Sequence, residues 1–357
     1  MMNLRDIPRP GPGQFICVPG CLHLLEEKLK RFRLPVIISG QKSYRAFVRH
    51  YPGKVPYPLL RYDGSCSHEN IRAIAERIPA PCDCILAIGG GKVLDTAKAV
   101  AAQLNIDYVT IPTQLGTCAA YTPLSVIYYP DHRIKGGEHY ERAAYLCLAD
   151  LNLLVHSPKE YLLGGIGDSL AKWYEADAAI RQMQTPPTAL TAAGLEIAAQ
   201  IRNLLLEYSG QAIAAIEAQR LNQGFEYCAQ AILGLGGMVG GLSGRTARVA
   251  GAHAIHDAMS QLAETHVYQH GVKVAYGILV QLAAEENYAE IERLLPYFAR
   301  HGFPRRLADL SVNFEKEQKM ALIAAIAASE KQSFRLALPR CSPELILKAI
   351  KYLEQLD

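Results

Sequence analysis

The sequence lacks several features that would mark a membrane, secreted or nucleic-acid-binding protein. No apolar stretch approaches the roughly 18 consecutive residues that a membrane-spanning helix needs. Basic runs and basic segments interleaved with aromatic residues are also absent, and the net charge is only +3, so nucleic acid is not an expected partner. The first 12 residues carry three prolines and do not resemble a signal peptide. Because the nine cysteines are odd in number and form no Cys-x-x-Cys pair, reduced thiols in a cytoplasmic protein are the expected state.

What is present fits a globular protein of two domains. Half of the residues are hydrophobic and 20% are charged, which is ordinary for a globular protein and leaves little room for extended disorder. A chain of 357 residues exceeds the size at which one hydrophobic core grows efficiently, so two domains are expected.

The first 150 residues alternate short apolar runs with helical stretches. Strands are predicted at residues 35–40 (PVIISG), 84–89 (CILAIG), 108–112 (YVTIP) and 145–149 (YLCLA). Helices are predicted between them, at 21–32, 68–78 and 93–104. This alternation predicts a mostly parallel sheet covered by helices, with ligands at the carboxyl ends of its strands.

The second half of the sequence has helical periodicity. Helices are predicted at 168–181, 188–208, 212–233, 245–263 and 272–285, with more to the end. The predicted domains are therefore 1–158, α/β, and 159–357, helical. The glycine-rich residues 234–244 are interpreted as a loop or as a close approach of helices.

The clearest motif is a run of three glycines, Gly89, Gly90 and Gly91, between a predicted strand and a predicted helix, followed by Lys92 and Asp95. Backbone N–H groups of such a turn approach a pyrophosphate closely, and the helix start adds partial positive charge. The motif matches neither the Walker pattern nor Gly-x-Gly-x-x-Gly. The alternative is a simple tight turn with Asp95 exposed in the first helical turn.

Hydroxyl and apolar side chains follow the next predicted strand. Those that could contact a coenzyme are Thr113, Thr117, Thr122, Leu124 and Tyr128. The hydroxyls could donate to phosphate or amide groups, while Leu124 and Tyr128 could flank a nicotinamide or ribose. The alternative for each threonine is local bonding to its own backbone.

Candidate metal ligands cluster in the second half. Asp168 follows glycines at a predicted helix start, where it could instead be an N-cap. His253 and His256 lie three residues apart on one helical face, with His266 and His270 close behind. One carboxylate and two imidazoles make an open three-ligand site, suited equally to catalytic zinc and to ferrous iron. Such a site polarises an alcohol oxygen so that a hydride can leave for a nicotinamide. A single helical histidine is more often structural.

Five ordered motifs resemble the iron-containing alcohol dehydrogenase superfamily, in its glycerol dehydrogenase-like branch. They are GGGKVLDTAK, IPT with LSVIY, GIGDSLAKWYEA, AGAHAIHDAM and HGVKVAYGILVQL. The resemblance implies a Rossmann-like dinucleotide-binding domain, an all-α C-terminal domain (the dehydroquinate synthase-like fold) and a cleft between them. It implies metal ligands at Asp168, His253 and His270, with His256 as a neighbouring group or proton relay.

The resemblance also assigns coenzyme contacts and an assembly. The implied coenzyme positions are Gly89, Gly90, Gly91, Asp95, Thr113, Thr122, Leu124 and Tyr128. A homodimer or a larger ring of dimers is the implied assembly.

Two departures from the family bear on substrate and coenzyme. Glycerol dehydrogenases carry an aspartate that meets a substrate hydroxyl, where this sequence has Cys118, interpreted as a small pocket wall or an inert thiol. NAD-preferring relatives carry an acidic residue after the first strand, where this sequence has Gln41, followed by Lys42 and Ser43. Lys42 or Ser43 could bind a 2′-phosphate, so NADP is expected to be accepted alongside or in preference to NAD.

The segments TCAA, TPLSV and LAKWYEA are most similar to those of the hydroxycarboxylate dehydrogenases of this branch. This resemblance implies reduction of short 2-oxo acids to 2-hydroxy acids with NADPH. Arg245, Arg248 or Lys172 could bind the substrate carboxylate, although each could equally be a surface or ion-paired side chain.

Other functions stay open. They are polyol oxidation of the glycerol dehydrogenase type, a sugar-phosphate cyclase, a ferrous oxygenase and a catalytically silent coenzyme-binding regulator. A cyclase would need a basic cluster for the substrate phosphate, which is not seen around Asp168 or His253. An oxygenase would leave the glycine turn without a purpose, and a regulator would have no need for three metal ligands.

Overall fold

A computed structural model describes residues 4–130, 133–244 and 246–356. The chain forms two compact units: unit 1 is Met1–Leu162 with Gln211–Gly241, and unit 2 is Leu163–Gly210 with Leu242–Asp357. The sequence-based division was a single one, at 158/159, whereas the chain passes between the compact units at three points.

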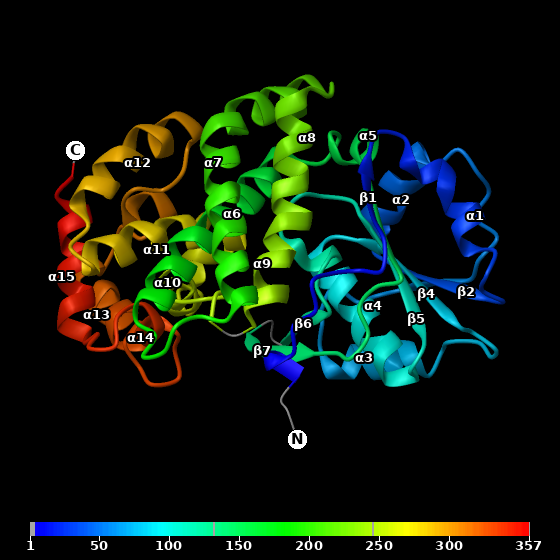
Figure 1. Ribbon diagram of the computed structural model, residues 1–357, viewed down its shortest axis with the longest axis horizontal. Helices are drawn as coiled ribbons and strands as arrows, with labels where there is room; N and C mark the ends of the chain where they lie inside the picture. The colour runs from blue at the N-terminus through cyan, green and yellow to red at the C-terminus, as the bar shows by residue number, and fades with distance from the viewer. Residues whose placement is uncertain (1–3, 131–132, 245, 357) are drawn as a thin grey trace. The chain divides into compact units, whose positions relative to one another are not determined.

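Unit 1 is built around a six-stranded parallel sheet (Figure 1). In order across the sheet its strands are β1 (Phe15–Val18), β8 (Leu146–Asp150), β5 (Asp107–Pro112), β4 (Cys84–Gly89), β2 (Pro35–Ser39) and β3 (Leu59–Arg61). The parallel sheet confirms the predicted α/β class, and β2, β4, β5 and β8 match the four predicted strands to within one residue at each end. The short edge strands β1 and β3 were not predicted.

The helical segments of unit 1 are mostly short. They are η1 (Leu4–Asp6), η2 (Cys21–Leu24), α1 (Leu25–Leu29), α2 (Gln41–His50), α3 (His68–Ala75), α4 (Gly91–Leu104), η3 (Cys118–Ala120), α5 (Leu151–Leu154), α8 (Gln223–Gln230) and the π-helical turn η4 (Ala231–Leu235). The predicted helix at 21–32 is therefore two shorter segments. A separate antiparallel pair, β6 (Leu124–Tyr128) and β7 (Ile134–His139), completes the unit.

The strands that lead to the glycine turn are fixed by packing in the core of the sheet. Every residue of β4 is buried, and alternate side chains such as Leu86 and Ile88 pack with Leu25 of α1 and Phe47 of α2. The helix that follows the turn, α4, packs against β4 and β5 (Figure 1). Gly89 and Pro112, paired in register at the carboxyl ends of β4 and β5, therefore lead into neighbouring loops.

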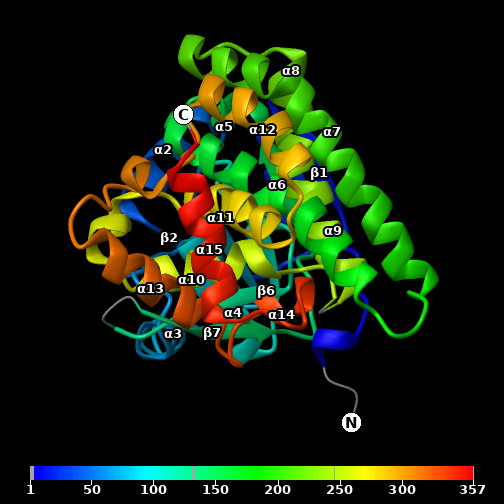
Figure 2. The same cartoon turned by 90° about the vertical axis from the view of Figure 1, so that its left-hand side faces the viewer.

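Three helices contribute residues to both units: α6 (Lys159–Arg181), α7 (Ala189–Ala218) and α9 (Gly236–Ser243). The remaining elements of unit 2 are α10 (Gly251–Met259), η5 (Ala263–Val267), α11 (His270–Ala284), α12 (Tyr288–His301), η6 (Leu307–Leu310), α13 (Lys316–Ala327), α14 (Phe334–Ala337) and α15 (Pro343–Glu354). Helix α11 is almost wholly buried and packs against α10, α12 and α15 (Figure 2). The predicted all-α character of the second half is confirmed for these elements.

Several predicted helix bounds were wrong. The predicted helix at 212–233 is interrupted at 219–222, between α7 and α8, and the one at 245–263 is reduced to α10, Gly251–Met259. Asp168 is not at a helix start, because α6 begins nine residues earlier at Lys159; the N-cap interpretation of Asp168 is therefore excluded. The predicted break between 208 and 212 is also absent, since α7 continues through Gly210 to Ala218. There the Ser209 hydroxyl donates to the Leu205 carbonyl within the helix, so the Ser-Gly pair is accommodated without a break.

Of the glycine-rich residues 234–244, all but Gly244 are helical, which favours the close-approach interpretation over the loop. A Cβ on Gly237 would lie 2.4 Å from the Tyr121 ring, and a Cβ on Gly241 would lie 2.3 Å from the Arg9 carbonyl oxygen. None of the helices in the described ranges is both long and apolar enough to cross a membrane.

Candidate functional site

The three glycines form the turn between β4 and α4. Gly89 ends the strand, Gly90 is the N-cap residue and Gly91 begins the helix. A Cβ on Gly89 would clash with Val93 at 2.5 Å, so packing alone requires that glycine. A Cβ on Gly91 would meet nothing nearer than the Thr117 hydroxyl at 3.6 Å. Packing therefore does not demand glycine at Gly91, and an open helix start is what close approach of a phosphate needs.

The side chains of Lys92 and Asp95, on the first turns of α4, point to different surroundings. The Lys92 ammonium lies 4.8 Å from the centre of the Tyr128 ring, and burial lowers the pKa of Lys92. Asp95 is not the exposed residue of the tight-turn alternative: it is buried, its Oδ2 accepts from the Val126 amide at 3.0 Å, and its Oδ1 lies 2.8 Å from Lys98 Nζ. Because these contacts occupy the Asp95 carboxylate inside unit 1, its coenzyme contact stays a prediction.

Lys98 was missed by the sequence analysis. Its side chain is fully buried, and besides pairing with Asp95 its ammonium donates to the carbonyls of Ala119, Thr122 and Leu124. A buried ammonium is costly unless it is paired and hydrogen-bonded, and these bonds hold the loop that carries the predicted threonines. The signal available in the sequence was the i, i+3 spacing of Asp95 and Lys98 on one helix.

The predicted coenzyme residues after β5 lie around that loop. The Thr113 amide donates to the Gly89 carbonyl at 3.1 Å, which ties the loop to the glycine turn. Thr117 caps η3, where its hydroxyl accepts from the Ala119 amide at 3.3 Å, as the local-bonding alternative expected. Leu124 and Tyr128 are the first and last residues of β6. Cys118 begins η3 and is partly buried.

The other predicted coenzyme residues begin α2, at the carboxyl end of β2. Gln41 and Lys42 are exposed, and the first turn of α2 contains no acidic residue. The Ser43 hydroxyl accepts from the Gly40 amide at 3.1 Å. Arg61, which the sequence analysis missed, ends the neighbouring strand β3; its guanidinium donates to the Gly40 carbonyl at 2.6 Å and lies over the Tyr44 ring. The sheet edge here is therefore basic.

Unit 2 brings together Asp168 from α6, His253 from α10 and His270 from α11. One ligand atom from each lies within 4.8 Å of the others. Nε2 of His253 is 3.3 Å, and Nε2 of His270 3.6 Å, from Asp168 Oδ1. One carboxylate oxygen and two imidazole nitrogens facing one point suit zinc or ferrous iron. The donor set therefore fits the metal that the sequence implies.

Electrostatics around this cluster favour negative charge on Asp168. Burial opposes that charge, but Lys172 at 3.4 Å and the two histidines outweigh it and hold the pKa of Asp168 well below its usual range. Burial alone would lower the pKa of His253, but the Glu175 and Asp168 carboxylates raise it to about 9. The Asp168 carboxylate is thus charged and ready to bind a cation, whereas His253 must lose its proton before its Nε2 can bind one, because only a neutral imidazole is a metal ligand.

His256 lies beside the cluster and not in it. Its Nε2 is 3.0 Å from Nδ1 of His270, and its Nδ1 is 3.0 Å from Oδ1 of Asp257. Burial, reinforced by His270, lowers the pKa of His256 to about 3, so it is a neutral ring. Since the Asp257 side chain is 39% exposed, these groups form a hydrogen-bonded route from His270 to solvent.

The other predicted residues of the second half are the fourth histidine and the cations proposed to bind a substrate carboxylate. His266 is exposed and its Nε2 bonds the Ser260 carbonyl, so it does not join the cluster. Of the candidate carboxylate-binding cations, Lys172 pairs with Asp168, and Arg248 donates to the Gly244 carbonyl at 3.0 Å. Arg245 lies outside the described residues.

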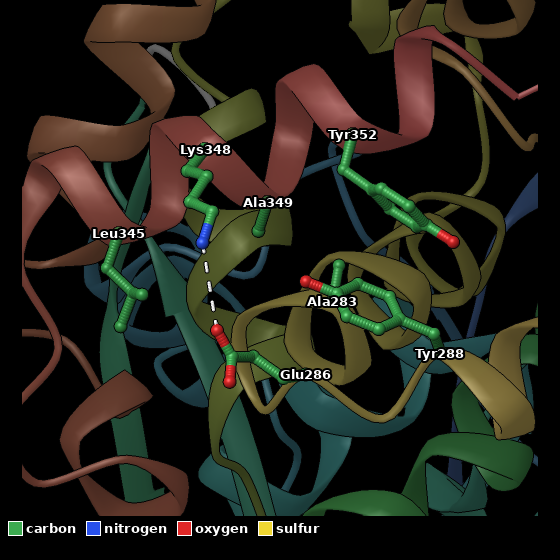
Figure 3. A pocket seen from close by; sticks show the side chains of 7 residues that line it. All are labelled: Ala283, Glu286, Tyr288, Leu345, Lys348, Ala349 and Tyr352. Atoms are coloured by element: carbon green, nitrogen blue, oxygen red, sulfur yellow. Dashed lines mark ion pairs between the residues drawn. The ribbon is translucent and has the colours of Figure 1, made fainter.

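A hollow elsewhere in unit 2 is too small to be a substrate pocket. Figure 3 shows its lining: the Lys348 ammonium points toward Glu286, and the rings of Tyr288 and Tyr352 lie next to each other, tilted by 48°. Its volume of about 10 Å³ holds at most one water. None of its lining residues is a candidate metal ligand.

Comparison with known proteins identifies the family of the chain. The family model for iron-containing alcohol dehydrogenases matches residues 12–151. Hydroxycarboxylate dehydrogenase A of Escherichia coli (strain K12) is 34% identical over 352 residues, covering 96% of each chain. Glycerol dehydrogenase of Thermotoga maritima is 31% identical and covers 90% of each chain.

A solved structure extends the similarity to the fold. A probable glycerol dehydrogenase from Sinorhizobium meliloti 1021 superposes with a TM-score of 0.86 at 27% identity, covering 98% of each chain. Similarity at this level over nearly the whole chain establishes the family and the reaction class. This protein belongs to the iron-containing alcohol dehydrogenase family and is an oxidoreductase that acts on CH–OH donors.

Proposed function

We propose that this protein interconverts short 2-oxo acids and 2-hydroxy acids, with NADPH as its reductant and a divalent metal, zinc or iron, held by Asp168, His253 and His270. The observation that carries the metal and the reaction is the convergence of those three side chains within 4.8 Å in unit 2. The substrate class is supported by the 34% identity to a hydroxycarboxylate dehydrogenase over 96% of the chain.

Each group of residues has a role in this proposal. A metal at the cluster supplies Lewis-acid polarisation of the carbonyl oxygen, and a nicotinamide coenzyme supplies the hydride. The open turn at Gly89, Gly90 and Gly91 receives the pyrophosphate, and Lys98 fixes the loop that flanks it. The substrate oxygen takes up one proton in the reduction, and the hydrogen-bonded chain of Asp257, His256 and His270 would be the route by which that proton enters the site from solvent.

The NADPH preference is supported by the charges at the carboxyl end of β2. In dinucleotide-binding folds an acidic side chain at this place binds the ribose 2′-hydroxyl, and an arginine accommodates a 2′-phosphate. This chain has Gln41 and Lys42 at the start of α2 and Arg61 on the adjacent strand. Arg61 and Lys42 would bind the 2′-phosphate, and no carboxylate in the first turn of α2 would repel it.

Polyol oxidation is the second candidate, because a glycerol dehydrogenase is 31% identical over 90% of the chain. Against it stands Cys118 at the position where the aspartate of glycerol dehydrogenases is expected. A thiol is a weak acceptor and does not replace a carboxylate at a substrate hydroxyl.

The test is a substrate panel on protein loaded separately with zinc and with ferrous iron. We expect NADPH oxidation with 2-oxobutanoate or 2-oxoglutarate, little with dihydroxyacetone, and a loss of roughly 1,000-fold or more in His253→Ala, by analogy with other removals of a key electrostatic group. His266→Ala is the matched control, because His266 is exposed and outside the cluster, and it should keep full activity.

Other results would change the assignment. A preference for glycerol or dihydroxyacetone would replace the 2-oxo acid proposal with polyol oxidation. Tight NADPH binding without bound metal or turnover would indicate a regulator. Conversion of a phosphorylated ketose without net coenzyme consumption would indicate a cyclase.

A further inference from the structure

A buried carboxylate, Glu175, contacts the candidate metal ligand His253 and has no part in the reaction proposed above. Glu175 lies seven residues after Asp168 on α6, so the two side chains share one face of the helix. Its side chain is 0% exposed. A buried carboxylate costs stability unless it is hydrogen-bonded or paired. The hydrogen bonds of Glu175 therefore indicate its role.

One oxygen of Glu175 caps the helix that carries His253. Helix α10 begins at Gly251, and its N-cap residue is Ala250, whose side chain can accept no hydrogen bond. Glu175 Oε1 accepts instead from the Ala250 amide at 2.6 Å and from the His253 amide at 2.9 Å. These are among the amide groups that a helix start leaves without partners, and a negative charge there is favourable.

The second oxygen fixes the ring of His253. Glu175 Oε2 lies 2.6 Å from His253 Nδ1. Because a carboxylate only accepts hydrogen bonds, the proton sits on Nδ1, and Nε2, which faces Asp168 Oδ1, keeps its lone pair for a metal when the ring is neutral.

His270 has a different partner and shows that this arrangement is specific to His253. Nδ1 of His270 meets the imidazole of His256, and its side chain is 39% exposed, against 12% for His253. One ligand is thus held by a charged buried group and the other by a neutral ring on a route to solvent.

We propose that Glu175 is a positioning residue for the metal: its two oxygens set, respectively, the start of α10 and the tautomer of His253. This inference rests on the metal site in the proposed function. It predicts that the charge and the acceptor character of Oε2 are needed for metal affinity, while the capping role needs only one acceptor oxygen.

Glu175→Gln separates the two roles. The amide oxygen can still accept hydrogen bonds from the two backbone amides. The NH₂ group, however, then faces His253 Nδ1 and favours the tautomer of His253 that carries the proton on Nε2. A protonated Nε2 cannot bind a metal. We expect zinc affinity, measured by competition with a chromophoric chelator, to fall roughly 10- to 100-fold, while the Tm of the metal-free protein falls less than it does in Glu175→Ala, because the helix cap is kept.

Glu175→Ala removes both oxygens, so its metal-free Tm should fall as well. Glu285→Gln is the matched control: Glu285 is a largely buried carboxylate at the C-cap of α11, bonded to Gln281 and Arg181 and not to a candidate ligand. That variant should bind zinc like wild type.

Nitrogen NMR of ¹⁵N-histidine-labelled, zinc-loaded wild type gives an independent check, with His253 assigned through His253→Gln. A protonated Nδ1 on His253 is expected. The inference is overturned if Nδ1 lacks a proton, or if Glu175→Gln binds zinc as tightly as wild type. Failure of wild type itself to bind zinc or ferrous iron would instead overturn the metal site and the proposed function with it.

Discussion

The two candidate sites are built in opposite ways. In unit 1 the coenzyme turn consists of consecutive residues, Gly89, Gly90 and Gly91, and it offers backbone groups between one strand and one helix. In unit 2 the candidate metal ligands come from three helices, and the candidate ligand atoms belong to side chains. The first site depends on local backbone geometry. The second depends on how closely α6, α10 and α11 pack, so changes to it should affect folding and function together.

The contact between α6 and α11 is where that dependence is strongest. A Cβ on Gly271 would lie 1.8 Å from the Gly164 carbonyl oxygen, and a Cβ on Gly167 would lie 2.2 Å from the Gly271 carbonyl oxygen. Both clashes are with backbone, which cannot rotate away. Asp168 and His270 are the direct sequence neighbours of Gly167 and Gly271, so the absence of side chains here is what brings the two ligands together.

The largest effect is therefore expected for Gly271→Ala. The added methyl group forces α6 and α11 apart, and overpacking of this kind costs about 3 kcal/mol. We expect the free energy of unfolding, measured by urea denaturation, to fall by that amount, and zinc affinity to fall at least roughly 100-fold because the ligand atoms separate.

Gly210→Ala is the control for this substitution. Gly210 lies inside α7, and a Cβ there would meet nothing closer than His301 Cε1 at 3.5 Å. Alanine is the better helix former by about 1 kcal/mol, so stability should be equal or higher and zinc binding unchanged. Wild-type stability and zinc affinity in Gly271→Ala would show that the metal site does not depend on the helix contact.

The same difference explains what could be predicted from the sequence. The glycine turn lies within one continuous window, where strand, glycines and helix follow one another, so its place between β4 and α4 could be predicted, although α4 begins at Gly91 and not at residue 93. The class of the sheet could also be predicted, because β2, β4, β5 and β8 are buried apolar runs. The strands β1 and β3 were missed, since three or four residues carry too little periodicity.

The metal site was predicted only as a set of residue types and through a resemblance. Glycines before Asp168 suggested the start of a helix, but they lie inside α6. They are glycines because α11 packs closely against this part of α6. Glu175 was passed over for a similar reason: its partners Ala250 and His253 are distant in sequence, and nothing local marks a helix cap supplied by another helix. Contacts between distant segments decide both features, and a single sequence does not show them.

An intermediate effect, on function without stability, is expected at the edge of the sheet in unit 1. Arg61→Ala should raise the KM for NADPH roughly 10-fold, which corresponds to about 1.4 kcal/mol, and leave the KM for NADH unchanged. The reason is that only NADPH carries the 2′-phosphate, while the guanidinium of Arg61 contacts the Gly40 carbonyl at the surface and supports little of the core. Steady-state kinetics with both coenzymes and a thermal melt provide the measurement.

Arg49→Ala serves as the comparison for Arg61→Ala, because Arg49 is an exposed cation in the last turn of α2, away from the helix start. It should change neither KM. If Arg61→Ala changed the KM for NADPH and for NADH equally, Arg61 would not be acting through the 2′-phosphate. A large loss of stability would show that Arg61 supports the core of unit 1.

The smallest effect is expected at the hollow in Figure 3, which belongs to neither site. The ion pair between Lys348 and Glu286 spans 3.7 Å, with side chains 70% and 65% exposed. Lys348→Ala should therefore change the free energy of unfolding by less than about 0.5 kcal/mol and leave zinc and coenzyme binding unaltered. Glu286 follows the end of α11 with φ +57°, a conformation that glycine adopts more easily. Glu286→Gly should raise stability slightly although it removes the same ion pair, and a loss above about 1 kcal/mol in both variants would show that the pair holds α11 and α15 together.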